Sequence, residues 1–336
     1  MTSKIIFASK KLGTIHHNQL QAMLDRFNLG TLISSRKTEL GAMGQTMFVS
    51  STKGDFILKG NPLYHGQLEE EKFFIENIEK RTDTPVPIPY LIDKSSDIFG
   101  WSYALMPHLP GEHIDSAQLK NTLTKENKLQ IAESIASTLT IFHKWKVADF
   151  GELHIETMKI TPLKPTYTDW IFQRIMFWLE DAKKYSTITD EDIEWSRSLL
   201  AEAKEAFHSL DSPTFIMGDF KPGNFLVNSG ESGWRISGVF DFTNSYFGDP
   251  VSDLIKMVTY YLNHNETGIA KHMLNKYFEG WSGRNFIKSR LKVHMLHQRV
   301  LDWGNGKATK TATWDDSISF SEWAAPYTEL IASLVD

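Results

Sequence analysis

The chain has 336 residues, 41% of them hydrophobic, and its 36 basic and 41 acidic side chains leave a formal charge of -5. This balance argues against a protein built mainly to coat nucleic acid. There is no cysteine, so disulfides and thiol chemistry are excluded and a reducing compartment fits. No apolar stretch approaches the length of about 18 residues that a membrane span needs. We therefore expect a soluble cytoplasmic protein, monomer or homodimer, that binds neither nucleic acid nor membrane.

The first third of the chain predicts an opening helix followed by strands. Apolar residues recur at helical spacing over 15–28, and glycine-bearing turns with hairpin patterns indicate strands over 31–59. A second amphipathic helix is expected over 67–81. Alternating prolines over 85–89 then favour an extended segment. A buried strand follows and ends in a turn at 107–111, which we interpret as a hinge.

The rest of the chain is predicted to be mostly helical. A long amphipathic pattern covers 128–145, and helical patterns dominate from about residue 168, interrupted by short strands that carry two polar motifs. Acidic residues at 190–192 read as a helix N-terminus. Several tryptophans suit core packing, although some could line a pocket: Trp170, Trp178, Trp281 and Trp303. Strands and helices are thus segregated along the chain, which indicates an α+β fold.

The two polar motifs are FIMGDFKPGNFLV at 215–227 and GVFDFTNSYFGDP at 238–250. Each begins with strand-forming residues and ends in a loop with a carboxylate. Phosphoryl transfer to an alcohol needs one carboxylate to deprotonate the hydroxyl and oxygen ligands to hold magnesium. Asp219 suits the first task, and Asn224 and Asp241 suit the second. Asn224 also follows Asp219 at the spacing found in the protein-kinase catalytic loop.

The order of these features resembles the aminoglycoside phosphotransferase family, a small-molecule branch of the protein-kinase-like fold. The resemblance covers about residues 30 to 260 and includes the family motif I-D-W-x-x-A-x-x-G-D-P-x-x-D-L, to which FDFTNSYFGDPVSDL aligns at Asp241, Gly248, Asp249, Pro250 and Asp253. It implies a bilobal fold. Residues 1–107 would form a small β-rich nucleotide-binding lobe with a helical extension, and 108–336 a larger helical lobe with the catalytic loop and substrate pocket.

The resemblance also implies catalytic roles. Asp219 would be the base, Lys221 would stabilise the moving phosphoryl group, and Asn224 and Asp241 would bind Mg²⁺ against the phosphates of ATP or GTP. Met217 stands where the family has histidine, which leaves the bracing of this loop unexplained. For Asp249 and Asp253 in the second motif, helix capping and loop bracing are the favoured roles.

A lysine, held by a glutamate, would contact the nucleotide phosphates. Lys59 ends the strand FILK as the corresponding kinase lysine does, and its partner must come from Glu69, Glu70 or Glu71. We choose Glu71, because only from Glu71 are the positions three, four and seven residues later all apolar, so that it lies on the inward face. Glu69 and Glu70 are expected to face water.

Two further segments would contact the nucleotide. The turn with Gly41 and Gly44 would direct backbone amides at the phosphates, although it lacks the full protein-kinase glycine pattern. The base would lie against the hinge, bordered by the backbone of Leu105, Met106, Pro107 and His108.

We therefore expect a kinase that uses ATP or GTP to phosphorylate a small-molecule hydroxyl. An aminoglycoside or another antibiotic is one candidate acceptor, with antibiotic resistance as the corresponding role. A small metabolite alcohol, as in choline or homoserine kinases, and a pseudokinase that acts by interaction alone remain open. A Ser/Thr protein kinase, which Lys221 favours, is disfavoured because nothing after Asp241 resembles an activation segment.

Overall fold

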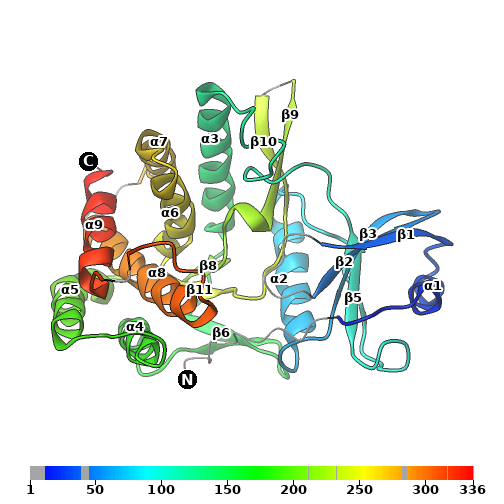
Figure 1. The fold of residues 1–336 in the computed structure, drawn as a ribbon, viewed down its shortest axis with the longest axis horizontal. Coiled ribbons are helices and arrows are strands. Elements are labelled where there is room, and N and C mark those ends of the chain that lie inside the picture. The colour runs from blue at the N-terminus through cyan, green and yellow to red at the C-terminus, as the bar shows by residue number, and fades with distance from the viewer. Residues whose placement is uncertain are drawn as a thin grey trace.

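The computed structural model describes residues 12–38, 45–210, 212–231, 233–281, 286–315 and 317–335. The predicted turn at Gly41 and Gly44 lies outside the described residues. Within them, one helix and then an antiparallel sheet come first in the chain, and helices dominate the rest, as Figure 1 shows. The predicted α+β, protein-kinase-like fold class is confirmed.

The N-terminal sheet has five strands in the order β1-β2-β3-β5-β4. Their bounds are Leu32–Lys37, Thr46–Ser51, Gly54–Gly60, Tyr103–Pro107 and Leu91–Asp93, respectively. Helix α1 (His17–Arg26) and helix α2 (Gln67–Arg81) lie on opposite faces (Figure 1). Because side chains alternate along a strand, Leu105 of β5 packs with α1 while Met106 belongs to the core that includes α2.

The helical part contains α3 to α9. Their bounds are Lys125–Phe142, Tyr167–Ala182, Asp190–His208, Ile255–Asn263, Thr267–Tyr277, Ile287–Thr309 and Phe320–Ser333. Helix α5 begins as predicted at an acidic N-terminus, where Thr189 caps the backbone of Asp192. No helix among the described residues is long and apolar enough to cross a membrane.

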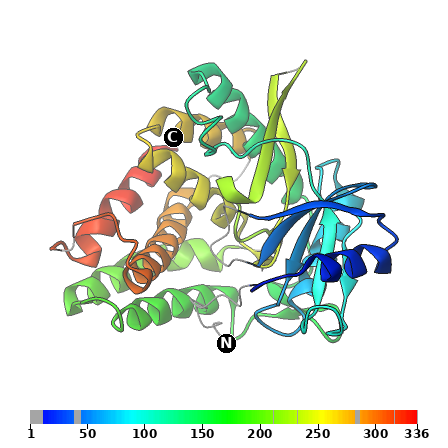
Figure 2. The ribbon, with the colours of Figure 1, turned by 45° about the vertical axis from the view of Figure 1, so that its right-hand side comes forward.

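Short strands lie between the N-terminal sheet and these helices, and some of them carry the two motifs. A four-stranded sheet has the order β7-β6-β11-β8, with bounds Lys159–Pro162, Gly151–His154, Tyr246–Gly248 and Thr214–Ile216. A separate hairpin pairs β9 (Phe225–Gly230) with β10 (Gly233–Val239). One 3₁₀ turn precedes β9 at Pro222–Asn224, and another follows β11 at Pro250–Leu254. The loops after β8 and β10 therefore meet between the N-terminal sheet and the helices (Figure 2).

Candidate active site

A cavity of about 1910 Å³ contains most of the predicted site residues. Its wall includes the N-terminal sheet, α2, both motif loops and the helices α4, α6 and α8. The sequence-predicted residues on this wall are Lys59, Glu71, Met106, His108, Asp219, Lys221, Asn224 and Asp241. Side chains from distant parts of the chain thus line the same cavity.

Asp219 lies at the centre of a network of donors. Its Oδ2 accepts from Asn224 Nδ2 at 2.9 Å and lies 2.8 Å from Lys221 Nζ, and its Oδ1 accepts from Lys256 Nζ at 2.5 Å. Burial alone would raise the pKa of Asp219, but Lys256 and Lys221 outweigh it and hold that pKa below its ordinary value. The carboxylate is therefore ionised at neutral pH, as a general base must be.

Asn224 and Asp241 present oxygen atoms close to this carboxylate. The Asn224 side-chain amide donates to the carbonyl of Asp219 at 2.8 Å as well as to its carboxylate, so its own side-chain oxygen remains available. The backbone N–H of Phe240 donates to the Asn224 carbonyl at 3.1 Å, which joins the two motif loops. Asp241 has φ of 65°, in the left-handed region that non-glycine residues rarely occupy.

Asp241 also accepts from Lys59 Nζ at 3.1 Å and from the hydroxyl of Thr243. Burial alone would raise the pKa of Asp241, yet Lys59 and the Thr243 hydroxyl lower it to about 2. This carboxylate is therefore ionised at neutral pH.

Lys59 is paired with Glu71, the glutamate chosen from the helical pattern. Lys59 Nζ donates to Glu71 Oε2 at 2.8 Å, and the hydroxyl of Tyr90 donates to the same oxygen at 2.6 Å. Glu71 is only 1% exposed, because the face of α2 that carries it packs into the core. The pair fixes the lysine between α2 and Asp241.

The expectation that Glu69 and Glu70 face water is wrong, since both are half-buried. Glu69 pairs with Lys94 at 2.8 Å. Glu70 lines the cavity and accepts from the hydroxyl of Tyr64 at 2.8 Å. Burial raises the pKa of Glu70 to about 7, against the effect of the Tyr64 hydrogen bond. The helical pattern missed this because Tyr64, which covers Glu70, precedes the helix.

The hinge segment borders the cavity through Met106, Pro107 and His108, whereas Leu105 does not line it. The side chain of Leu105 packs on the α1 side, and its backbone lies between Leu58 and Leu91 of the neighbouring strands. The N–H of His108 donates to Asp55 O at 2.9 Å, inside the sheet. Burial lowers the pKa of the His108 imidazole, so this side chain is neutral at pH 7.

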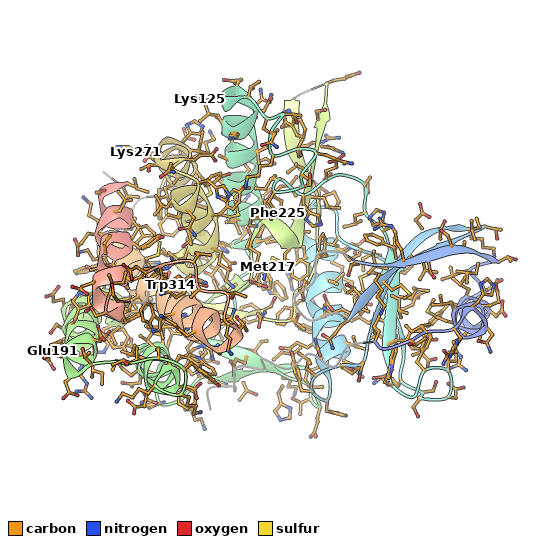
Figure 3. The ribbon with its side chains drawn as sticks, in the orientation of Figure 1. Lys125, Glu191, Met217, Phe225, Lys271 and Trp314 are labelled. Atoms are coloured by element: carbon orange, nitrogen blue, oxygen red, sulfur yellow. The ribbon has the colours of Figure 1, made fainter. Side chains whose placement is uncertain are left out.

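The loop after β8, which carries Asp219, is braced by Asp253, which supplies the support that Met217 cannot give. Asp253 Oδ2 accepts from the N–H of Met217 at 2.7 Å, and Oδ1 accepts from the N–H of Gly218 at 2.8 Å. Met217 itself lies in the interior (Figure 3) and is 0% exposed. Gly218 has φ of +77°, and a Cβ there would lie 2.2 Å from the carbonyl oxygen of Asn244. The loop therefore needs both Asp253 and glycine.

Asp249 performs the capping and bracing expected of it. Its Oδ1 accepts from the N–H of Val251 at 3.1 Å, and its Oδ2 lies 2.9 Å from Arg290 Nε and 3.0 Å from His294 Nε2. It is 0% exposed. Burial alone would raise the pKa of Asp249, but Arg290 holds it well below its ordinary value.

Lys256 is the main residue of this site that the sequence analysis missed. It lies in α6, three residues after Asp253, and therefore almost one helical turn further along the chain. Its position three residues after Asp253 could have indicated Lys256 from the sequence. Its contact with Asp219, however, depends on how α6 packs against the loop that carries Asp219.

Comparison with known proteins identifies a family. The model of the phosphotransferase enzyme family (APH) matches residues 36–287. No match was found among curated proteins.

Similar solved structures have 14–15% identity to this chain and therefore inform on the fold alone. A thermostable mutant of the aminoglycoside phosphotransferase APH(4)-Ia in its apo form has a TM-score of 0.63, with 95% of this chain and 98% of that chain covered. A ternary complex of a mutant of that enzyme with ADP and hygromycin B has a TM-score of 0.62 and covers 93% and 97%. The GDP complex of wild-type aminoglycoside 2'-phosphotransferase-IIIa has a TM-score of 0.57 and covers 95% and 97%.

Proposed function

The chain belongs to the phosphotransferase enzyme family, and from this premise we propose that it transfers the γ-phosphate of ATP or GTP to a hydroxyl group of a small molecule. The observation that carries this proposal is the convergence of Asp219, Asn224, Asp241 and the Lys59–Glu71 pair on one cavity. An aminoglycoside is one candidate acceptor and a small metabolite alcohol is another. Residues 1–107 would form the nucleotide-binding lobe and 108–336 the lobe that binds the acceptor.

Asp219 acts as the general base in this proposal. The acceptor hydroxyl approaches Asp219, takes the position of one lysine contact and gives its proton to the carboxylate. A bond then forms between the hydroxyl oxygen and the γ-phosphorus, and the bond from the γ-phosphorus to the bridging oxygen breaks, so that ADP or GDP leaves with that electron pair. Lys221, 2.8 Å from Asp219, is placed to stabilise charge on the transferred group.

The donor set fits magnesium. Asp241 offers an ionised carboxylate and Asn224 an amide oxygen, which are the hard ligands that Mg²⁺ prefers. Within the described residues no group of three or more His, Cys, Asp or Glu side chains could hold a metal, and Mg²⁺ in kinases needs only one or two protein ligands because phosphates and water supply the others. When bound, Mg²⁺ neutralises charge on the phosphates.

The sheet side of the cavity would hold the nucleotide. Lys59 would contact the α- and β-phosphates, with Glu71 fixing its position. Met106, Pro107 and His108 would border the base. The N–H of His108 already donates to Asp55 and points toward β3. Backbone groups of neighbouring residues in a strand point to opposite sides. The Pro107 carbonyl and the Leu109 N–H would therefore point away from β3, toward the nucleotide base. Related structures hold GDP and ADP, so both ATP and GTP remain candidate donors.

Thermal shift with nucleotide tests the first half of this proposal. ATP or GTP should raise Tm more in the presence of Mg²⁺ than in its absence. Asp241→Ala should lose the magnesium-dependent part of this increase in Tm. Asp219→Ala should keep the nucleotide shift and lose phosphorylation. If no nucleotide stabilises the protein with or without Mg²⁺, the proposal is wrong.

A further inference from the structure

Beyond Asp219 the cavity continues among the helices. The side chains that line this part would contact the acceptor. This part is lined from α4, α6 and α8 by aromatic and charged groups: Trp170, Arg174, Trp178, Lys256, His297 and Asp302. Lys256 contacts Asp219, which ties this region to the proposed base. The inference below rests on the proposed function and narrows its acceptor.

Arg174 is held in place but leaves the end of its guanidinium free. Its planar head packs over the ring of Trp170, 5.4 Å from the ring centroid, and its Nε donates to His297 Nε2 at 3.3 Å. No described residue forms an ion pair with Arg174 or hydrogen-bonds to its two terminal nitrogens. The side chain is half-buried. A fixed guanidinium with a free end presents two parallel donors to an oxyanion.

None of the described carboxylates of this region forms an ion pair with Arg174. Asp302 is bound to Arg299 and also accepts from Gln298 at 2.8 Å. Glu152, on β6, lines the same cavity; burial lowers the pKa of Arg174 and the charge of Glu152 opposes that shift, but no ion pair joins the two side chains. Glu70 accepts from Tyr64 and has a pKa of about 7, so it is only partly charged at neutral pH.

Two cations, Lys221 and Lys256, contact the Asp219 carboxylate directly. His297 lies beside Arg174, and burial together with Arg174 and Lys256 holds the pKa of His297 well below its ordinary value. Neutral His297 can therefore accept from Arg174, which keeps its charge. A polycationic acceptor would be repelled by this guanidinium, while Asp302 is already paired with Arg299.

We propose that Arg174 binds an oxyanion of the acceptor, a carboxylate or a phosphate monoester, while the acceptor hydroxyl lies at Asp219. The substrate class is therefore an anionic hydroxy compound and not a polyamine sugar. Trp170 holds the plane of the guanidinium, and His297 is a positioning residue that leaves both terminal nitrogens for the ligand. Bidentate pairing at such a site is worth about 1.5–3 kcal/mol, which corresponds to about 10- to 100-fold in affinity.

Calorimetric titration into the Mg²⁺–ADP complex tests this inference. The probes are hydroxycarboxylates, each paired with its carboxamide, hydroxyl-bearing phosphate monoesters such as glycerol 3-phosphate, and hygromycin B as the polycation. Wild type, Arg174→Gln and Arg174→Lys are compared. Lys183→Gln, which removes an exposed cation at the end of α4 outside the cavity wall, is the charge-matched control. ADP binding in every variant reports separately on the nucleotide site.

At least one carboxylate or phosphate probe should bind more tightly than its neutral counterpart. Arg174→Gln should remove about 10- to 100-fold of that affinity, Arg174→Lys should restore part of it, and Lys183→Gln should change nothing. The two anion arms identify which oxyanion is preferred. The inference is overturned if no anionic probe binds better than its neutral partner, if Arg174→Gln keeps the preference, or if hygromycin B binds best. If wild type does not bind ADP at all, the proposed function itself is overturned instead.

Discussion

Asp253 provides a test of how the loop that carries Asp219 is held. The substitution Asp253→Ala removes the acceptors for the N–H groups of Met217 and Gly218, at 2.7 Å and 2.8 Å. It also removes the contact of 3.3 Å with His143 Nε2. Asp253 is 3% exposed, so water cannot easily replace it, and both backbone donors are left without partners.

The magnitude follows from these two charge-assisted hydrogen bonds. Each contributes about 1.5–3 kcal/mol, so the free energy of unfolding should fall by about 3–6 kcal/mol. A chain of 336 residues has an unfolding entropy of about 0.7 kcal/mol/K at about 2.1 cal/mol/K per residue. Tm should therefore fall by about 4–8 °C if unfolding is cooperative. Displacement of Asp219 by about 1 Å should lower kcat on the order of 100-fold.

Differential scanning calorimetry and a coupled ADP-release assay measure both effects. Glu202→Ala is the matched control, because Glu202 is an exposed acid of α5 away from the cavity. ADP affinity should change less than kcat, since Asp253 contacts the backbone of Met217 and Gly218 and not the side chains proposed to hold the nucleotide and Mg²⁺. If Asp253→Ala behaves like Glu202→Ala in both Tm and kcat, the bracing role assigned to Asp253 is refuted.

Four further predictions concern charged side chains in and behind the site. Lys256→Met removes a cation that lowers the pKa of Asp219, so the acidic limb of the pH profile of kcat/KM should move to higher pH; an unmoved limb contradicts this. Glu71→Gln weakens the anchor of Lys59 and should raise KM for the nucleotide about tenfold, with an unchanged KM as the opposing result. Asp249→Ala leaves Arg290 buried without its partner and should cost about 3–5 kcal/mol in urea unfolding. Because the pKa of Asp249 lies below its ordinary 3.8, its ion pair stabilises the fold above about pH 4, and this stabilisation is lost on acidification. Tm should therefore fall less steeply with decreasing pH in Asp249→Asn than in wild type. Equal slopes would contradict this role of the ion pair.

Local patterns were enough to predict much of this molecule. The helix over 67–81 matches α2, and its apolar face alone identifies Glu71 as the partner of Lys59. The two motifs predicted where Asp219, Asn224 and Asp241 would meet, because their loops follow short strands. Each of these features depends on a few neighbouring residues and on the order of the elements.

Contacts between distant segments could not be predicted in the same way. Lys256 reaches Asp219 from a helix 37 residues further along the chain, and Glu70 is covered by Tyr64 from the preceding loop. Arg174 and His297 come from helices that pack together only in the folded protein. Periodicity shows which face of a helix is buried, but not which side chain of another helix it meets.

The most direct test of the central claim is the transfer of labelled γ-phosphate from ATP or GTP to a panel of small hydroxyl compounds, by wild type and by Asp219→Ala. Wild type should phosphorylate at least one compound, and Asp219→Ala should lose that transfer while its nucleotide affinity stays close to that of wild type. Equal transfer by Asp219→Ala would contradict the assignment of the base. Absence of transfer to every compound, together with absence of nucleotide binding, would contradict the account as a whole.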